Sequence, residues 1–369
     1  MKSYRIMISG GGTGGHIFPA IAVARAFGLR FPASEILFVG ADNRMEMERV
    51  PAAGYRIVGL PVCGFDRSRK LKNVSVLFKL FKSLRMAKKL LRTYQPDLVV
   101  GVGGYASGPT LWAASSLRIP TLIQEQNSYA GITNKWLGKR VDTVCVAYEG
   151  MERFFPARKI VLTGNPVRKE LEETSEEKEK ALAYFRLSAE KKTVLVLGGS
   201  LGARTVNRSV LNGLDRLLDA GIQLIWQTGR SGYDLIRQQL EGKDTRNLLW
   251  CSGFISRMDC AYAAADLVVS RAGAGSIAEL CLLKKPAILI PSPNVAEDHQ
   301  TKNALAVANR DAAMVIADRD AETQLTDGIL NLVCDTERLH VFGEQIGRLA
   351  HLRSAERIVD EMVKLIVKE

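Results

Sequence analysis

A glycine-rich loop that ends in a histidine is the first feature of this chain with chemical potential, since residues 9–16 read SGGGTGGH. Glycines let backbone N–H groups approach a phosphate closely, and the N-terminus of a following helix favours anions. Thr13 adds a hydroxyl donor. The glycines also fit the dinucleotide motif G-x-G-x-x-G, but there the position of His16 only packs a helix against a strand. A histidine at a strand end suits a general base, although it can also cap or pack a helix.

Two more glycine loops follow predicted strands later in the chain. Residues 198–204, GGSLGAR, lack the Lys-Ser/Thr pair of a P-loop. Residues 270–279, SRAGAGSIAE, carry Ser276 and Glu279 at the spacing of a capping box that would open a helix. Glu279 is therefore interpreted either as part of that cap or as a carboxylate that binds a ribose diol.

Polar residues also gather where predicted strands end. Glu125, Gln126 and Asn127 follow the apolar run 121–124, at the edge where doubly wound sheets bind their ligands. The loop 291–304 supplies further ligand or helix-capping groups in Asp298, His299, Gln300 and Asn303.

Positive charge is concentrated in one segment. Ten of the basic residues lie between Arg67 and Arg92 with no acidic residue among them, in a chain of net charge +12. A helix predicted over 74–93 is either packed in the core with a solvated face or bound to anionic lipid, and the run of charge favours lipid. Nucleic acid is not expected, because aromatic residues for base stacking are few. The expected membrane contacts are Leu77, Phe78, Lys79, Phe81, Lys82, Leu84, Arg85 and Lys89.

The composition indicates a globular protein of two domains. The chain has 369 residues, of which 47% are hydrophobic. We find no apolar run of about 18 residues and no leader pattern, so we expect neither a transmembrane helix nor a signal peptide. The six cysteines and four histidines are scattered, which disfavours zinc and disulfides and fits a reducing cytoplasm. Residues 318–320, DRD, are interpreted as surface charge, and neither a metal nor another cofactor is expected.

Alternation of short apolar runs with helical patterns predicts the fold class. The first half contains seven candidate strands, and the second half repeats the strand, glycine-turn and helix pattern from residue 193. Continuous apolar runs are typical of strands buried on both faces of a parallel sheet. We predict two doubly wound α/β domains, residues 1–164 and 165–347. We predict a final amphipathic helix in residues 348–369, and packing against the N-terminal domain is one way to bury its apolar face.

Seven motifs, in order along nearly the whole chain, resemble those of the bacterial UDP-N-acetylglucosamine:N-acetylmuramyl-(pentapeptide) pyrophosphoryl-undecaprenol N-acetylglucosaminyltransferases, the MurG family. Each motif is weak alone, and the set is specific. The motifs are GGGTGGHIFPA (10–20), GGYASGP (103–109), QEQNSYAGITNK (124–135), TGNPVR (163–168), GGSLGAR (198–204), SRAGAGSIAE (270–279) and DHQTKNA (298–304).

This resemblance implies a GT-B fold, in which two Rossmann-like domains face a cleft. It implies transfer of GlcNAc from UDP-GlcNAc to the 4-hydroxyl of MurNAc in lipid I, undecaprenyl-pyrophosphoryl-MurNAc-pentapeptide. The transfer inverts the anomeric carbon and gives lipid II and UDP in peptidoglycan synthesis. The implied partners are the donor UDP-GlcNAc, the acceptor lipid I and the anionic cytoplasmic face of the cell membrane.

The resemblance also carries donor contacts over to this chain. Glu279 would bind the ribose, Ile255 would contact uracil through its backbone, and Gln300 would contact GlcNAc. Where His299 stands, some family members carry a second glutamine. The other implied contacts are Thr13, Gly14, Gly15, Asn127, Arg168, Ser200, Ala274, Gly275 and Ser276.

An inverting transfer needs a base for the acceptor hydroxyl and donors for the leaving diphosphate. His16 is the first candidate for the base and Glu125 the second. Judged from the residues alone, two other enzyme functions remain as alternatives. An NAD-dependent oxidoreductase would use only the first glycine loop, and a UDP-GlcNAc 2-epimerase would share the fold and the donor. The basic helix favours a lipid-linked acceptor, while a non-catalytic lipid-binding protein would leave three glycine loops unused.

Overall fold

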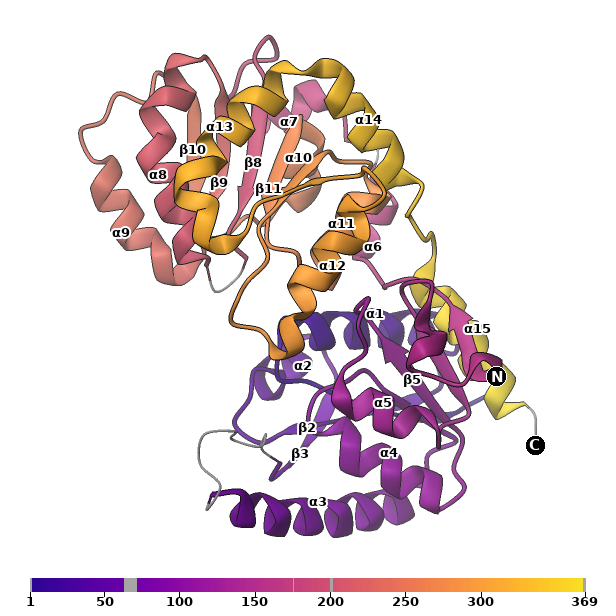
Figure 1. Ribbon diagram of the computed structural model, residues 1–369. Helices are drawn as coiled ribbons and strands as arrows, with labels where there is room; N and C mark the ends of the chain where they lie inside the picture. The colour runs from indigo at the N-terminus through magenta and orange to yellow at the C-terminus, as the bar shows by residue number, and fades with distance from the viewer. Residues whose placement is uncertain (1, 63–71, 175, 200–201, 368–369) are drawn as a thin grey trace. The chain divides into compact units, whose positions relative to one another are not determined.

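The computed structural model describes residues 2–62, 72–174, 176–199 and 202–367, which form two α/β domains (Figure 1). The N-terminal domain consists of Met1–Val167 and Leu352–Glu369, and the C-terminal domain of Arg168–His351. Each domain has one sheet, and all strand pairs are parallel. The predicted fold class of two doubly wound domains is therefore confirmed. Ser200, a predicted donor contact, lies outside the described residues.

The N-terminal sheet has the strand order β3-β2-β1-β4-β5-β6-β7. The chain starts in the middle of the sheet, moves outward to β3 and returns to β4 on the other side of β1. This reversal creates a switch point between β1 and β4, and the loops that follow these two strands meet there. The strands are β1 (Arg5–Ser9), β2 (Glu35–Ala41), β3 (Arg56–Leu60), β4 (Leu98–Gly101), β5 (Thr121–Glu125), β6 (Thr143–Val146) and β7 (Ile160–Leu162).

Helices cover both faces of this sheet. On one face, α1, α2 and α15 contribute to a single hydrophobic cluster with alternate strand residues. On the other face, α3, α4 and α5 form a second cluster with the remaining strand residues. Burial on both sides explains why the strands read as continuous apolar runs. The helices are α1 (Gly14–Arg30), α2 (Glu46–Ala52), α3 (Lys72–Tyr94), α4 (Ser107–Ser116), α5 (Ile132–Gly138) and α15 (Ser354–Ile366), and 3₁₀ turns span Met151–Arg153 and Ala157–Lys159.

Helix α1 begins earlier than its sequence indicates. The helical pattern of the sequence covers residues 19–30 and so predicts a helix with Pro19 in its first turn, where a proline is best tolerated. In the structure the helix starts at Gly14, with Thr13 as an extended N-cap residue, and contains Pro19 within it. The early start matters because it places His16 in the first turn of α1 rather than in the loop.

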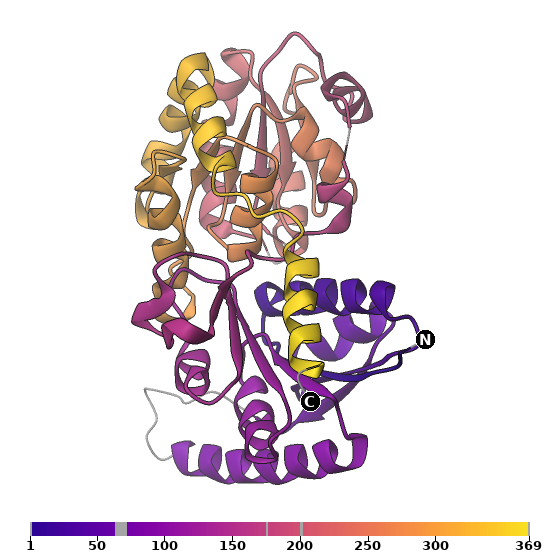
Figure 2. The ribbon, with the colours of Figure 1, turned by 90° about the vertical axis from the view of Figure 1, so that its right-hand side faces the viewer.

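The C-terminal helix completes the core of the N-terminal domain. Helix α15 packs against α1, and the two helices lie side by side in Figure 2. Ile358, Val359 and Met362 of α15 are fully buried in the cluster that also contains α1. An ion pair between Arg30 and Asp360 joins the exposed edges of the two helices.

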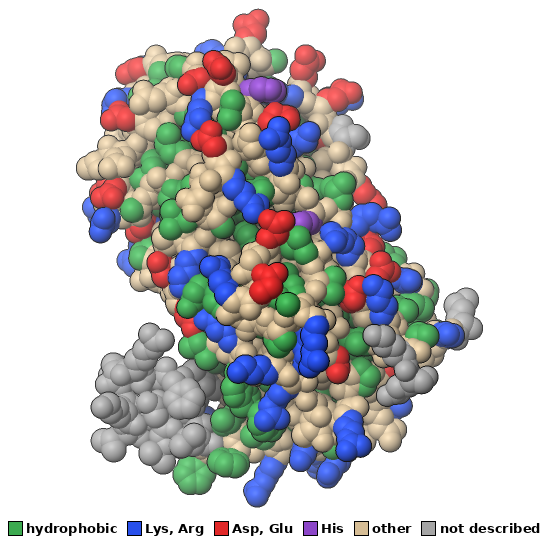
Figure 3. Space-filling model, turned by 45° about the vertical axis from the view of Figure 1, so that its right-hand side comes forward, with side chains coloured by type: hydrophobic (Ala, Val, Ile, Leu, Met, Phe, Trp, Pro, Cys, Tyr) green, Lys and Arg blue, Asp and Glu red, His purple; other side chains and the backbone are tan. Residues whose placement is uncertain are grey.

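Helix α3 exposes aromatic side chains on the surface of the N-terminal domain. Phe78 and Phe81 are 73% and 66% exposed, whereas Ser83, Ala87 and Leu91 are buried and form the packed face. The apolar stripe of α3 is therefore not wholly packed in the core, because its two phenylalanines face solvent. Figure 3 shows basic and hydrophobic side chains together at the lower end of the molecule, where Figure 1 places α3. No helix of the described residues is long and apolar enough to cross a membrane. The exposed basic side chains of α3 include Lys79, Lys82, Arg85 and Lys89.

The C-terminal domain repeats the same topology with the strand order β10-β9-β8-β11-β12-β13. Its switch point lies between β8 and β11, so residues 198–199 and 271–273 directly follow the two central strands. The strands are β8 (Thr193–Leu197), β9 (Gln223–Gln227), β10 (Leu249–Ser252), β11 (Leu267–Ser270), β12 (Ala287–Leu289) and β13 (Met314–Val315). The helices are α6 (Lys169–Glu172), α7 (Lys178–Tyr184), α8 (Arg204–Asp219), α9 (Arg230–Leu240), α10 (Met258–Ala264), α11 (Ala274–Leu282), α12 (His299–Ala308), α13 (Ala321–Cys334) and α14 (Thr336–Gly347), with 3₁₀ turns at Ala296–Asp298 and Asp318–Asp320.

Candidate active site

The loops after β1 and β4 touch through their backbones. The Gly11 N–H donates to the Gly103 carbonyl oxygen at 3.3 Å. A Cβ atom on Gly104 would lie only 2.3 Å from the Gly11 carbonyl oxygen, and the φ angle of Gly104 is +86°. Both the close approach and the left-handed conformation require glycine at this position. The two glycine motifs of the N-terminal domain thus form one structural unit at the switch point.

His16 lies on this unit, in the first turn of α1. Its Nδ1 atom is 3.1 Å from the Gly11 carbonyl oxygen and 3.3 Å from Thr13 Oγ1. When Nδ1–H donates to that carbonyl, the neutral ring carries its lone pair on Nε2. A Cβ atom on Gly103 would lie 2.9 Å from His16 Nε2, so the ring packs directly on that glycine. This arrangement holds the imidazole in the tautomer that can accept a proton at Nε2.

Glu125, the second candidate base, is enclosed by its own loop. The carboxylate is 1% exposed. One oxygen accepts hydrogen bonds from the backbone N–H and side-chain amide of Asn127, and the other accepts from the Gly131 N–H and the Asn134 amide, at 2.9–3.3 Å. Burial raises the pKa of Glu125, and these hydrogen bonds oppose the rise. Four donors on two oxygens fit a carboxylate that holds residues 127–134 in place.

A buried amide network joins two of the sequence motifs. Gln124 donates to the Asn165 side-chain oxygen at 3.0 Å, and Asn165 donates to the Gln126 carbonyl at 2.9 Å. Gln126 also hydrogen-bonds to Gln124 and to the Val102 carbonyl. The side chains of these three residues are buried. Gln126 therefore connects β4, β5 and the segment before the domain boundary, and the sequence gives no local sign of this long-range pairing.

Glu46 supports the first glycine loop in a way that the sequence does not reveal. It opens α2, is 1% exposed, and accepts the Gly12 N–H at 2.8 Å and the Ala41 N–H at 3.0 Å. The Glu46 side chain also fills the space into which a Cβ atom on Gly11 would point. The protein's own carboxylate therefore closes the first glycine loop on the side opposite the β4 loop.

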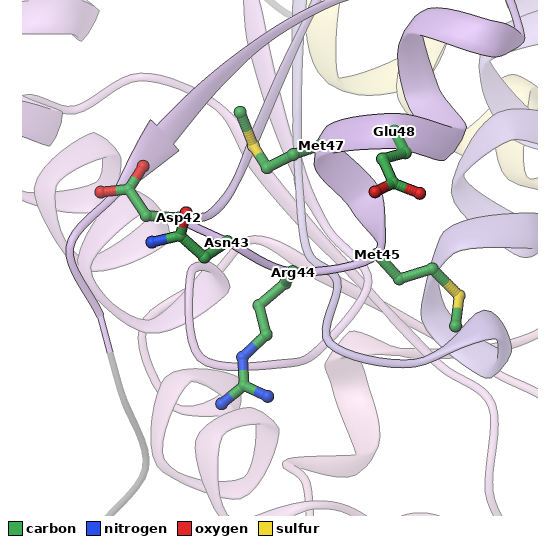
Figure 4. A pocket seen from close by; sticks show the side chains of 6 residues that line it. All are labelled: Asp42, Asn43, Arg44, Met45, Met47 and Glu48. Carbon is green, nitrogen blue, oxygen red and sulfur yellow. The ribbon is translucent and has the colours of Figure 1, made fainter.

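A pocket of about 480 Å³ opens at the loop between β2 and α2 (Figure 4). The close-up shows a carboxylate, an amide and a guanidinium group on the loop before α2, with methionine side chains beside them. All its lining residues come from one short segment, and the predicted site residues are not among them. The lining residues are Asp42, Asn43, Arg44, Met45, Met47 and Glu48.

In the C-terminal domain, a carboxylate is held where α6, α10 and α11 meet. Glu279 Oε2 accepts the Tyr262 hydroxyl at 2.8 Å, and Glu279 Oε1 lies 3.2 Å from Arg168 Nε. Burial raises the pKa of Glu279, while Arg168 and the Tyr262 hydrogen bond oppose the rise. Arg168 and Glu279, both predicted donor contacts, are thus brought together.

The capping-box interpretation of Ser276 and Glu279 is wrong. Helix α11 starts at Ala274, with Gly273 as its N-cap residue and no side-chain cap. Ala274, Gly275 and Ser276 consequently form the first turn, where backbone N–H groups have no intrahelical partner. Glu279 lies one turn further along the helix and is paired by Tyr262 and Arg168 instead.

Two further predicted donor contacts, Ile255 and Gln300, lie in the same domain. The Ile255 side chain is buried, and its N–H donates to Gln227 Oε1 at 3.0 Å. The Gln300 Oε1 atom accepts the Ser292 N–H at 2.8 Å, which fixes this side chain against the loop before α12. His299 is the first residue of α12.

Two acidic groups of the C-terminal domain are structural. Asp318 is not free surface charge, because its carboxylate binds Arg271 and the Thr205 hydroxyl and so anchors the loop after β11. Among the described residues, Glu176, Asp259 and Cys260 place three possible metal-ligand atoms within 4.8 Å. Arg257 binds both of those carboxylates, as expected for an ion-pair cluster.

Comparisons with known proteins match both domains. The glycosyltransferase family 28 N-terminal domain model matches residues 6–146, and the C-terminal domain model of that family matches residues 193–348. The chain is 63% identical, over the full length of both chains, to the UDP-N-acetylglucosamine–N-acetylmuramyl-(pentapeptide) pyrophosphoryl-undecaprenol N-acetylglucosamine transferase of Parabacteroides distasonis. It is 56% identical to the transferase of that name from Phocaeicola vulgatus, covering 100% of this chain and 98% of the relative.

Solved structures of the same architecture agree with this match. The crystal structure of Acinetobacter baumannii MurG aligns with a TM-score of 0.80 at 26% identity, covering 98% of this chain and 99% of that one. A UDP-N-acetylglucosamine 2-epimerase aligns with a TM-score of 0.61 at 13% identity, covering 98% and 96%. At that identity, the epimerase likeness shows the fold alone.

Replacing Glu46 by glutamine tests whether its carboxylate closes the first glycine loop. The Glu46→Gln amide can accept through only one atom, so either the Gly12 or the Ala41 N–H loses its buried partner. We expect the free energy of unfolding to fall by about 1–3 kcal/mol in a denaturant titration. Glu48→Gln on the exposed face of α2 is the matched control and should change it by less than about 0.5 kcal/mol. Equal stability of the two variants would contradict the role given to Glu46.

Proposed function

The chain belongs to the UDP-N-acetylglucosamine–N-acetylmuramyl-(pentapeptide) pyrophosphoryl-undecaprenol N-acetylglucosamine transferase family, and from this premise we propose its reaction and the residues that perform it. It is a glycosyltransferase that moves GlcNAc from UDP-GlcNAc to the MurNAc 4-hydroxyl of lipid I, giving lipid II and UDP. The single observation that carries this function is the 63% identity to a full-length relative of that name.

The C-terminal domain holds the donor in this proposal. Glu279 accepts hydrogen bonds from the ribose hydroxyls, since each carboxylate oxygen has more than one acceptor direction. The first turn of α11 and the Arg168 guanidinium offer N–H groups and positive charge to the diphosphate. The Ile255 N–H is already bonded to Gln227, which leaves the Ile255 carbonyl as its backbone group for uracil. Gln300 contacts the GlcNAc ring, and Ser200 remains a proposed diphosphate contact.

The N-terminal domain holds the acceptor and supplies the base. His16 is the base in our proposal, because its Nδ1 lies beside the Gly11 carbonyl, and the tautomer that donates from Nδ1 to this oxygen has its lone pair on Nε2. Thr13, Gly14 and Gly15 form the N-terminus of α1 beside it. Glu125 acts by position: it anchors the loop that carries Asn127, and its buried, fully bonded carboxylate is poorly suited to proton transfer.

The chemical step needs one proton acceptor and one leaving group. The acceptor hydroxyl oxygen attacks the anomeric carbon of GlcNAc from the face opposite the diphosphate. The bond from that carbon to the β-phosphate oxygen breaks, and its electron pair leaves with UDP. The hydroxyl proton passes to His16 Nε2, and N–H donors around the diphosphate stabilise the charge that develops there. Attack from the opposite face inverts the anomeric configuration.

We also propose that α3 attaches the protein to the anionic cytoplasmic face of the membrane. Phe78 and Phe81 are exposed, so they can enter the interface, while Lys79, Lys82, Arg85 and Lys89 meet acidic headgroups. Leu84 is half-buried at the edge of this face, and the side chain of Leu77 lies outside the described part of the structure. Peripheral attachment would bring the enzyme to an acceptor that is itself a lipid.

Incubation with radiolabelled UDP-GlcNAc and a lipid I analogue tests the transferase function directly. We expect label in the lipid product. Folded protein that leaves the lipid unlabelled refutes the function, and conversion of UDP-GlcNAc without acceptor identifies an epimerase instead. Stabilisation against heat by NADH but not by UDP would revive an oxidoreductase.

Replacing His16 by alanine tests the assignment of the base. Loss of a general base lowers a rate by about 10²–10⁴-fold, so the His16→Ala kcat should fall within that range. The UDP dissociation constant should stay within about twofold, because Ile255, Glu279 and Arg168, proposed to bind the uracil, the ribose and the diphosphate, lie in the C-terminal domain. His340→Ala, an exposed histidine of α14, is the control and should retain its rate. If Glu125→Gln instead loses more activity than His16→Ala, the roles of the two residues must be exchanged.

Charge reversal on α3 tests the membrane attachment. The triple change Lys79, Lys82 and Lys89→Glu should weaken binding to vesicles with anionic lipid by at least about 100-fold, because each basic residue contributes about 1 kcal/mol. The control reverses three exposed lysines of the C-terminal domain, Lys180, Lys191 and Lys243, and changes the net charge equally. Sedimentation with vesicles measures both variants. An equal loss in both would indicate general electrostatics rather than a specific α3 surface.

A further inference from the structure

Tyr262 is a buried tyrosine whose hydroxyl has a specific target. It lies on α10 and is 1% exposed. Its hydroxyl donates to Glu279 Oε2 at 2.8 Å. A buried tyrosine hydroxyl needs a partner, and here the partner is the carboxylate assigned to the ribose rather than a backbone group.

The two partners of Glu279 differ in mobility. The Tyr262 ring is fixed by packing, since α10 contacts α6, α7 and β8. Arg168, which lies 3.2 Å from the other carboxylate oxygen, has a side chain that is half exposed. An exposed guanidinium can turn toward a bound diphosphate, whereas the buried tyrosine cannot leave the carboxylate. The lasting constraint on the direction of the Glu279 carboxylate is therefore the Tyr262 hydroxyl.

A fixed carboxylate is what recognition of a ribose diol requires. After accepting the Tyr262 hydroxyl, Oε2 keeps a second acceptor direction, and Oε1 keeps at least one. A site built to hydrogen-bond a substrate hydroxyl discriminates strongly against an analogue that lacks it, provided the protein group is held in position.

We propose that Tyr262 is a positioning residue that aims the Glu279 carboxylate at the ribose hydroxyls and so makes the site select ribonucleotides over 2′-deoxyribonucleotides. The proposal rests on the donor site described above, because it takes Glu279 as the ribose ligand. Sequence alone gives no sign of this pairing, since Tyr262 and Glu279 lie on different helices.

Titration calorimetry with UDP and 2′-deoxy-UDP on the full-length protein tests this role. We expect the wild type to bind UDP about tenfold more tightly than 2′-deoxy-UDP. Tyr262→Phe should weaken UDP binding by about three- to tenfold and leave 2′-deoxy-UDP binding within about twofold, so that the preference nearly disappears. Tyr184→Phe, a half-exposed tyrosine of α7, is the matched control and should keep the full preference.

The contrary results are distinct. A purely structural tyrosine would weaken both ligands equally and leave their ratio unchanged, which overturns the proposal. Glu279→Gln gives a second test that does not depend on whether the Tyr262→Phe protein folds. This variant should abolish the preference for UDP over 2′-deoxy-UDP. Adding Tyr262→Phe to Glu279→Gln should cause no further loss of UDP affinity. A preference that survives in Glu279→Gln also overturns the proposal. Failure of the wild type to bind UDP at all would instead refute the proposed donor site.

Discussion

The backbone contact between the loops after β1 and β4 is the constraint on which the N-terminal site depends. A Cβ atom on Gly104 would lie 2.3 Å from the Gly11 carbonyl oxygen, so any side chain at position 104 would push the two loops apart. The same carbonyl oxygen receives His16 Nδ1, and the ring packs on Gly103. Glu46 closes the loop from the other side. Loop contact, imidazole orientation and buried carboxylate thus form one assembly at the switch point of the sheet.

The two domains share a topology but use it differently. In the N-terminal domain, the Glu46 carboxylate beside the glycine loop is buried and accepts hydrogen bonds from backbone N–H groups, so it stabilises the loop itself. In the C-terminal domain, Glu279 is held by a tyrosine and an arginine side chain instead. This difference follows from which residues surround each switch point, because strand order alone is nearly identical. Fold and site are therefore separable, and the role of each site depends on the individual residues around its switch point.

The sequence predicts the architecture well because its signal is local. Continuous apolar runs locate the strands, and the repeated strand–glycine–helix pattern predicts two similar domains. Helix starts are less predictable: glycine and proline obscure the start of α1, and a capping-box spacing misplaces the start of α11. Pairings such as Glu46 with Gly12, Gln124 with Asn165 and Tyr262 with Glu279 join distant segments, so no local pattern indicates them. The roles of the predicted site residues in binding and catalysis stay predictions.

The most direct measurement of this account is the rate of GlcNAc transfer to a lipid I analogue by Gly104→Ala. Its added methyl group must separate the two loops, so we predict a kcat at least about tenfold lower, with UDP affinity unchanged. Gly28→Ala in α1, where a Cβ atom meets nothing within 4 Å, should transfer at the wild-type rate. A folded Gly104→Ala protein with wild-type kcat would contradict the claim that this backbone contact positions the catalytic histidine.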